Sequence, residues 1–191
     1  MNIQNRIEQL AQSISALEQR RIEQPSMAQA GVLIALTEED EPHMVLTQRS
    51  TQLSTHSGEV AFPGGKRDPE DDDIVFTALR EAHEEVGLQP QDVNVIGELH
   101  QVFSRFGYVV TPVVGLIKPN LELVANPGEL DSIFKVPVRH FLENDPDEFF
   151  ERGSIKMPTY HYEGYRIWGL TAMMIAEMMN NHFGAAIEFK I

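Results

Sequence analysis

The sequence predicts a layered α/β sandwich, and three observations lead to this class. Apolar runs rich in β-branched residues recur along the chain, most clearly at Ala30–Thr37 and Tyr108–Ile117. Stretches with helical spacing of apolar residues lie between such runs, and the strongest is Ile74–Val86. The chain shows no internal repeat or low-complexity segment. Strands interleaved with helices over 191 residues favour one layered domain with small additions.

The composition argues against several classes of protein. No apolar run reaches the roughly 18 residues that a membrane helix needs, and the start MNIQNRIEQL has no signal-peptide pattern. The absence of cysteine excludes disulfides and thiolate metal sites. A formal charge of −14 disfavours nucleic-acid binding, which needs a basic surface. We therefore expect a cytoplasmic protein that binds neither nucleic acid nor membrane.

The N-terminal stretch, residues 2–22, is predicted to be an amphipathic helix. Its apolar residues recur at spacings of 4, 3, 4 and 3, which places them on one stripe. These residues are Ile3, Ile7, Leu10, Ile14 and Leu17. The stripe either packs on the helix's own domain or contributes to a homodimer contact. Pro25 marks a connector, so residues 1–24 are expected to precede a main domain at 25–191.

The other elements follow from residue pattern. His43–Arg49 reads as the hairpin partner of Ala30–Thr37. Further strands are expected at Glu59–Phe62, Val93–Phe103, Tyr108–Ile117, Leu130–Val138 and Tyr160–Ile167. A helical turn is expected at Val138–Leu142 and a helix at Trp168–Phe183. Loops are expected at 50–57, 118–128 and 145–153, and 185–191 is either a last strand or a disordered tail.

The helix Ile74–Val86 combines an apolar stripe with an acidic face. The stripe consists of Val75, Leu79, Ala82 and Val86. At roughly 100° per residue, three carboxylates share an arc nearly opposite this stripe, and they belong to Glu81, Glu84 and Glu85. Asp71–Asp73 suit a helix N-terminus, and Gly87 suits its C-terminal end.

The sequence before this helix turns the acidic face into a candidate metal site. Gly64 and Gly65 permit a tight loop with close backbone approach, and Arg80 can pair with Glu84 four residues later. Carboxylate oxygens suit Mg²⁺ or Mn²⁺, which in turn bind substrate phosphates. Such an ion also resolves how a negative protein binds an anionic substrate. The alternative is an acidic helix face that is merely solvated.

This stretch resembles the Nudix box, G-x5-E-x7-R-E-U-x-E-E-x-G-U with U apolar. Arg80, Glu81, Ala82, Glu84, Glu85, Gly87 and Leu88 match its last part. Asp72 stands where the box has its first glutamate, and the loop is one residue longer than expected. The resemblance implies a Nudix-type α/β/α sandwich with a mixed β-sheet and a loop–helix–loop catalytic motif, so that residues 25–191 form a Nudix hydrolase domain.

The resemblance also implies roles for the site residues. Glu81, Glu84 and Glu85 would hold Mg²⁺ or Mn²⁺, and Glu81 and Glu84 are both candidates for the general base. Arg80 would orient these carboxylates. Among residues expected to bind the nucleotide substrate, Gly64 and Gly65 form the loop before the helix. Arg49 either pairs with a substrate phosphate or forms a strand-end ion pair. Glu129 is either a further ligand or base, or a surface residue.

A second resemblance concerns the substrate. Leu46–Ser50, Gly58 and Phe62–Gly65 are similar to the coenzyme A pyrophosphatase signature, L-L-T-x-R-[SA]-x3-R-x3-G-x3-F-P-G-G. Ser54 replaces its second arginine, so we expect weakened substrate binding unless Arg49 or Arg105 takes that role. Asn126–Leu130 and Gly164–Ala172 also resemble this subfamily.

The second resemblance implies cleavage of coenzyme A or acyl-CoA to 3′,5′-ADP and (acyl-)4′-phosphopantetheine. The alternatives are hydrolysis of ADP-ribose or dinucleotides, and a non-catalytic module that senses a nucleotide. Phe103, Phe106 and Tyr108 are candidates to stack on adenine, with core packing as the alternative.

Overall fold

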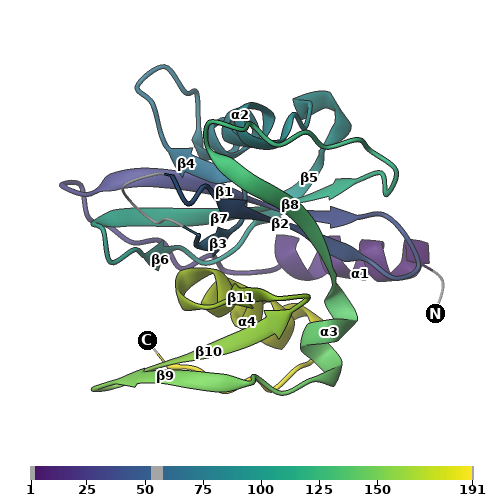
Figure 1. Ribbon diagram of the computed structural model, residues 1–191, viewed down its shortest axis with the longest axis vertical. Helices are drawn as coiled ribbons and strands as arrows, with labels where there is room; N and C mark the ends of the chain where they lie inside the picture. The colour runs from purple at the N-terminus through teal and green to yellow at the C-terminus, as the bar shows by residue number, and fades with distance from the viewer. Residues whose placement is uncertain (1–2, 53–57, 191) are drawn as a thin grey trace.

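A mixed sheet forms the centre of the computed structural model, which describes residues 3–52 and 58–190, with side chains from residue 7 onward (Figure 1). β1 and β7 run parallel along their whole length, and the other pairings in this sheet are antiparallel. Its strands are β1 (Ala28–Thr37), β2 (His43–Arg49), β3 (Val60–Ala61), β4 (Gly64–Lys66), β5 (Asn94–Glu98), β6 (Val102–Phe103), β7 (Tyr108–Ile117) and β8 (Leu130–Pro137).

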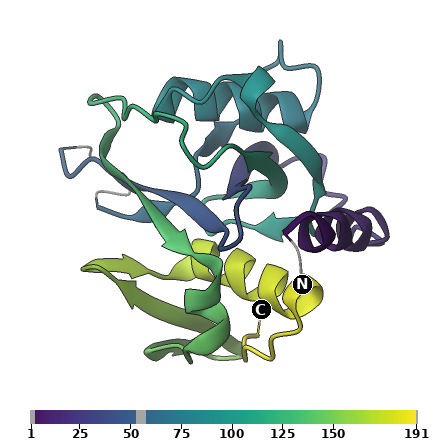
Figure 2. The ribbon, with the colours of Figure 1, turned by 90° about the vertical axis from the view of Figure 1, so that its right-hand side faces the viewer.

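Helices cover both faces of this sheet. α2 (Ile74–Val86) lies on one face, while α1 (Ile3–Ser15) and α4 (Gly169–Phe183) lie on the other (Figure 2). This arrangement confirms the expected α/β/α sandwich. None of the helices in the described part of the chain is long and apolar enough to cross a membrane.

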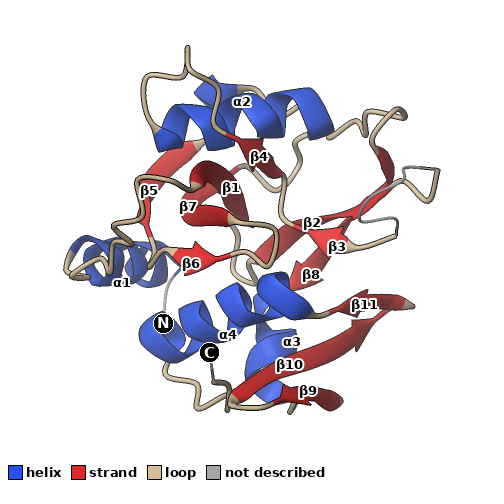
Figure 3. Ribbon diagram, turned by 90° about the vertical axis from the view of Figure 1, so that its left-hand side faces the viewer, coloured by secondary structure: helices blue, strands red, loops and turns tan. Residues whose placement is uncertain are grey.

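A second, three-stranded sheet adds a further layer beyond α4. It consists of β9 (Glu148–Arg152), β10 (Ile155–Tyr162) and β11 (Tyr165–Ile167), and α3 (Val138–Glu143) connects it to the main sheet. α4 therefore lies between two sheets (Figure 3). Its residues Thr171–Met179 are all buried, as expected for a helix that is apolar on every side.

The boundaries of α2 follow from local signals in the sequence. The Asp73 side chain accepts a hydrogen bond from the backbone amide of Phe76 at 2.7 Å and caps the helix. Gly87 ends it with a left-handed φ of 70°. Small residues then let the helix approach the sheet: Ala78 and Ala82 are fully buried, and a Cβ at Gly31 would lie 2.7 Å from the carbonyl oxygen of Ile74.

Several predicted elements are shorter than expected. α1 ends at Ser15 rather than near residue 22, because the following residues bond to another segment instead of continuing the helix. The amide of Arg20 donates to the His100 ring at 2.9 Å, and the amide of Ile22 donates to Gln101 at 2.7 Å. The single strand expected at 93–103 is divided into β5 and β6.

The three-stranded sheet of β9, β10 and β11 differs most from the sequence prediction. Residues 145–153 were expected to form a loop, but β9 pairs with β10 as an edge strand. The strand expected at 160–167 is a hairpin of β10 and β11, whose turn holds Glu163 and Gly164 at positive φ. Lys190 near the end of the chain forms an isolated bridge with Lys156. Residues 64–66, expected as loop, form β4 against β1. A short 3₁₀ turn, η1 (Pro90–Asp92), follows α2.

Candidate active site

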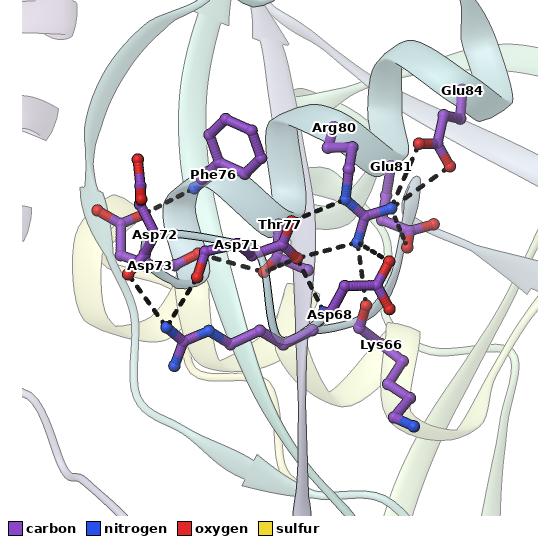
Figure 4. A network of polar contacts seen from close by, with 11 residues as sticks. Lys66, Asp68, Asp71, Asp72, Asp73, Phe76, Thr77, Arg80, Glu81 and Glu84 are labelled. Carbon is purple, nitrogen blue, oxygen red and sulfur yellow. Dashed lines mark hydrogen bonds and ion pairs between the residues drawn. The ribbon is translucent and has the colours of Figure 1, made fainter.

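An ion pair between Arg80 and Asp71 anchors the acidic face of α2. The Arg80 guanidinium donates to both oxygens of Asp71, at 2.9 and 3.0 Å, and Thr77 donates its hydroxyl to the same carboxylate at 2.8 Å (Figure 4). Asp71 is 4% exposed. The hydrogen bond from Arg80 holds the pKa of this carboxyl far below its usual range, against the effect of burial. The pair is therefore ionised at neutral pH.

The same arginine connects the loop before α2 to the carboxylates on the helix. Its Nη1 lies 2.9 Å from Glu81 and 3.4 Å from Glu84, and its Nη2 donates to the carbonyl oxygen of Lys66 at 3.1 Å. The expectation that Arg80 orients these carboxylates agrees with this geometry. Alignment to the box had placed Asp72 as the matching acid, but Asp72 is exposed and Asp71 holds the arginine.

Glu85 lies on the packed side of α2 rather than on an exposed acidic arc. It is 4% exposed, and its carboxylate accepts a hydrogen bond from the backbone amide of Gly64 at 3.1 Å. Burial raises the pKa of Glu85 to about 7, and the charges of Glu81 and Glu129 act in the same direction. Of the three carboxylates predicted to share one arc of the helix, Glu85 is the buried member, and it points toward Gly64 at the start of β4. Val75 and Leu79 of that stripe are only half-buried.

Glu81 lies directly against the glycine strand β4. A Cβ at Gly65 would be 2.5 Å from the Glu81 carboxyl carbon, so any larger residue here would have to push the end of the Glu81 side chain aside. Burial raises the pKa of Glu81, and the charges of Glu84 and Glu129 raise it further. Glu84 is the most open of the three, with half of its side chain exposed. The backbone of β4 therefore lies next to both Glu81 and Glu85.

The loop before β8 places Glu129 near these carboxylates. The amide of Asn126 donates to the carbonyl of Glu85 at 2.8 Å, which fixes the loop at the end of α2. The Asn126 side chain donates to the Glu129 carboxylate at 3.2 Å. The backbone carbonyl of Glu129 in turn accepts the amide of Ser50, beside the end of β2. The half-buried Glu129 is therefore held by its loop, and its charge acts on both Glu81 and Glu85.

Arg49 supplies positive charge near the buried carboxylate of Glu85. Its charge lowers the pKa of Glu85, which shows that the two groups are near each other. The buried Nε of Arg49 has no hydrogen-bond partner among the residues described. An arginine with an unused donor beside a cluster of carboxylates suits a phosphate contact. Ser54, which stands where the coenzyme A signature has an arginine, lies outside the described residues.

The donor set fits a divalent cation. Glu81 and Glu85 both have raised pKa values because negative charges gather where solvent is partly excluded. A cation would neutralise that charge, and carboxylate oxygens are the ligands that Mg²⁺ and Mn²⁺ prefer. Within residues 3–52 and 58–190, no three carboxylate or histidine groups converge to enclose an ion as they stand. Arg80 binds both Glu81 and Glu84 in this state, so these side chains would have to turn from the arginine to a metal.

Two features of the site escaped the sequence argument. Asp71 was grouped with its neighbours as a helix-capping residue, and its burial under Arg80 depends on the path of the loop. Asn126 lay in a segment noted only for its resemblance, and its contact with Glu129 needs the fold. The proline and glycine that follow it signalled a turn, which could have marked Asn126 as a residue with a local side-chain bond.

Known proteins share both the sequence and the fold. The model of the NUDIX domain matches residues 27–156. The chain is 43% identical to the "uncharacterized Nudix hydrolase NudL" of Photorhabdus laumondii over 153 residues, which cover 78% of this chain and 82% of the relative. It is 44% identical to the protein of the same name from Citrobacter koseri over 154 residues, covering 78% and 80%.

Solved structures at low identity support the fold. The Nudix hydrolase RenU of M. smegmatis is 23% identical, with a TM-score of 0.52 over 61% of this chain and 74% of that one. An Ap4A hydrolase of C. elegans is 15% identical, with a TM-score of 0.51 over 60% and 84%. The family comprises hydrolases of nucleoside diphosphate-linked substrates that generally use divalent metals. With its retained carboxylates and its matching sequence, the chain belongs to the Nudix hydrolase family.

Proposed function

We propose that this enzyme hydrolyses coenzyme A or acyl-CoA to 3′,5′-ADP and (acyl-)4′-phosphopantetheine. The observation that carries the proposal is a contact between two distant segments that resemble the coenzyme A pyrophosphatases. β3 lies within the first segment, Leu46–Gly65, and pairs with β2. Thr171, in the second segment, donates its hydroxyl to the carbonyl oxygen of Val60 in β3 at 3.0 Å. Their contact beside the glycine strand supports a joint role in substrate binding.

The residues of the site divide the chemistry among them. Glu81, Glu84 and Glu85 would hold Mg²⁺ or Mn²⁺, which supplies positive charge against the pyrophosphate oxygens. Glu81 and Glu84 are the candidates to accept the proton of the attacking water. The water oxygen bonds to one phosphorus as that phosphorus loses its bond to the bridging oxygen, so two phosphate monoesters leave.

Other side chains bind and orient. Arg80 keeps the carboxylates of α2 in place through its pair with Asp71. Gly64 and Gly65 let β4 pack against β1 and the Glu81 carboxylate, which would position this loop to contact the substrate's phosphates. Arg49 would donate to a phosphate through its guanidinium, which is only partly buried. Glu129 adds a further carboxylate near Glu81 and Glu85, as a ligand or a base.

A pyrophosphatase that acts on ADP-ribose or dinucleotides is the second candidate. Ser54, which stands where the coenzyme A signature has an arginine, is the observation that favours it. A module that only senses nucleotides is disfavoured because Glu81, Glu84 and Glu85 are all retained.

The test is the identity of the products. Coenzyme A, acetyl-CoA, ADP-ribose and NADH would each be incubated with the protein and Mg²⁺ or Mn²⁺, and the products measured by mass spectrometry. We expect 3′,5′-ADP and 4′-phosphopantetheine from coenzyme A, the highest kcat/KM for that class, no product with EDTA, and a rate lower by about 10²-fold or more with Glu85→Gln. Turnover of ADP-ribose or NADH without cleavage of coenzyme A would overturn the substrate assignment in favour of the second candidate.

A further inference from the structure

Two arginines and two aromatic rings form an exposed cluster at one end of α4. The Arg105 guanidinium lies 4.6 Å from the ring centroid of Phe106 and 5.7 Å from that of Trp168. The Arg166 guanidinium lies 5.0 Å from the Trp168 ring. Both arginine side chains are about half exposed or more, at 62% and 48%. We name Arg105, Phe106, Arg166 and Trp168 the cation–π cluster.

Three separate parts of the chain build this cluster. Arg105 and Phe106 lie in the turn between β6 and β7, Arg166 lies in β11, and Trp168 is the residue before α4. Arg166 and Trp168 also belong to the Gly164–Ala172 segment, and neither side chain has a role among the catalytic residues assigned so far. Residues this far apart in sequence converge on one aromatic ring only because the second sheet brings β11 beside β3.

The cluster lies within reach of a substrate held at the catalytic carboxylates. Arg105 pairs with Glu59 at 2.8 Å, and Glu59 precedes β3 and lies five residues before Gly64. Five residues span at most about 18 Å, which is shorter than an extended coenzyme A molecule. Figure 3 shows β3, β4, β6 and the start of α4 on the same side of the molecule. A substrate cleaved beside Gly64 can therefore contact the cluster with one of its ends.

The chemistry of the cluster suits a phosphorylated nucleoside. An arginine stacked on an aromatic ring keeps its N–H edge directed outward, and that edge matches phosphate geometry. Exposed aromatic rings stack on bases. The present partners of the arginines are Glu59 at 2.8 Å and Glu148 at 3.4 Å. Surface ion pairs of this kind contribute only about 0–1 kcal/mol, so a phosphate dianion can replace them.

We propose that the cation–π cluster binds the nucleotide end of the substrate, with Arg105 and Arg166 on a ribose phosphate monoester and the base stacked on Phe106. The proposal rests on the proposed function and deepens it, because coenzyme A carries such a phosphate on its ribose and ADP-ribose does not. It also assigns a source of positive charge to a chain that has Ser54 in place of the signature arginine. The cluster would then select substrates that carry the extra phosphate.

The sole tryptophan of the chain makes binding measurable without catalysis. Adenosine 3′,5′-bisphosphate and AMP would be titrated against Trp168 fluorescence in EDTA. We expect saturable binding of the bisphosphate that weakens by roughly 10- to 100-fold in Arg105→Gln and in Arg166→Gln, the loss expected for one charged hydrogen bond. Binding of AMP should change much less. Arg152→Gln, an exposed arginine of β9, is the matched control and should bind both ligands normally.

Kinetics separate this proposal from the proposed function. With coenzyme A, Arg105→Gln and Arg166→Gln should each raise KM by the factor by which they weaken bisphosphate binding, and kcat should stay within a few-fold of wild type. This pattern indicates that the arginines bind the ground state and the transition state equally well. Arg166→Lys should restore part of the bisphosphate affinity. Unchanged bisphosphate affinity and unchanged KM in both variants overturn the cluster but leave the substrate assignment intact. Wild-type protein that binds the bisphosphate through these arginines but does not cleave coenzyme A supports the cluster and overturns the substrate assignment.

Discussion

The backbone amide of Gly64 and the carboxylate of Glu85 are joined by a hydrogen bond of 3.1 Å. This contact links the start of β4 to the packed side of α2, between residues 21 positions apart. Among the described residues, this amide is the only hydrogen-bond donor to the buried Glu85 carboxylate. A carboxylate kept in such surroundings destabilises the fold, which indicates a role other than stability.

Glu85→Gln should therefore lower activity and raise stability. Glutamine can still accept the Gly64 hydrogen bond, but it removes the buried charge. Burial raises the pKa of Glu85 from 4.5 to about 7, so its ionised form at pH 8 is disfavoured by on the order of 3 kcal/mol. We expect a higher Tm and a loss of activity of about 10²-fold or more. Glu122→Gln, an exposed glutamate, should change neither. A variant that is active, or less stable than wild type, contradicts this assignment.

Divalent metal should stabilise the wild-type protein through the same carboxylates. A ligand that binds only the folded state at 100 times its Kd adds about 2.7 kcal/mol, or roughly 5–10 °C in Tm for a chain of this size. Thermal scans with Mn²⁺ and with EDTA should show this shift in wild type and a much smaller one in Glu85→Gln. An equal shift in both proteins would place the metal elsewhere.

Asp71 rather than Asp72 should govern the stability of the α2 network. Asp71→Asn leaves Arg80 without its buried partner and should cost about 3–5 kcal/mol at pH 7. Asp72→Asn should change the free energy of unfolding by less than about 0.5 kcal/mol. Because Arg80 lowers the folded-state pKa of Asp71, this stabilisation is present above the unfolded pKa near 3.8 and is lost as pH falls. The gap between wild type and Asp71→Asn in urea unfolding should narrow below about pH 4.

Gly65 and Gly64 should respond differently to alanine. A Cβ at Gly65 meets only the movable end of Glu81, so Gly65→Ala should displace that carboxylate and lower kcat with little change in Tm. A Cβ at Gly64 meets the backbone of Gly31 and Val32, so Gly64→Ala should lower Tm. Activity assays and thermal scans on the two variants test this contrast. If Gly65→Ala lowered Tm as much as Gly64→Ala, the Glu81 side chain could not move aside, and this prediction would be wrong.

Tyr160 should make the protein sensitive to alkali. The buried hydroxyl has no hydrogen-bond partner among the described residues, and burial raises its pKa to about 12. The unfolded chain releases this proton near pH 10, so stability is lost as pH rises from about 10 to 12. Tyr160→Phe should remove that part of the loss and leave stability at pH 7 equal or higher. Tyr165→Phe, which loses a bond to Ser132, should keep the alkaline loss and cost about 0.5–1.5 kcal/mol.

Local signals explain which elements the sequence predicts. Asp73 and Gly87 define both ends of α2, and the apolar run of β7 leaves no alternative to a buried strand. The β9 strand has five exposed residues and no apolar alternation, so its pairing appears only with β10 in place. The length of α1 depends on bonds from residues 19–22 to residues 98–101, which no local pattern reports.

The candidate site was predicted in composition but not in arrangement. Glu81, Glu84 and Arg80 meet as their spacing suggests. α2 packs on the sheet mainly through Ala78 and Ala82, and Glu85 lies beside these two residues and is buried with them. The predicted apolar stripe was centred on Val75 and Leu79 instead, so the sequence did not predict that Glu85 would be buried. The spacing of the motif also indicated Asp72 as the acid that matches the first glutamate of the box. In the structure the preceding residue, Asp71, binds Arg80, because the path of the loop decides which carboxylate reaches the arginine.

Because α4 packs between two sheets, the match to the NUDIX domain ends before the packed unit of the fold is complete. That match stops at residue 156, inside β10. A chain truncated there would lose α4 and expose the apolar face of the main sheet that holds Leu46, Val60 and Val114. A piece of this protein able to fold should therefore extend at least to the end of α4 at Phe183, and expression of the matched region alone should yield aggregates.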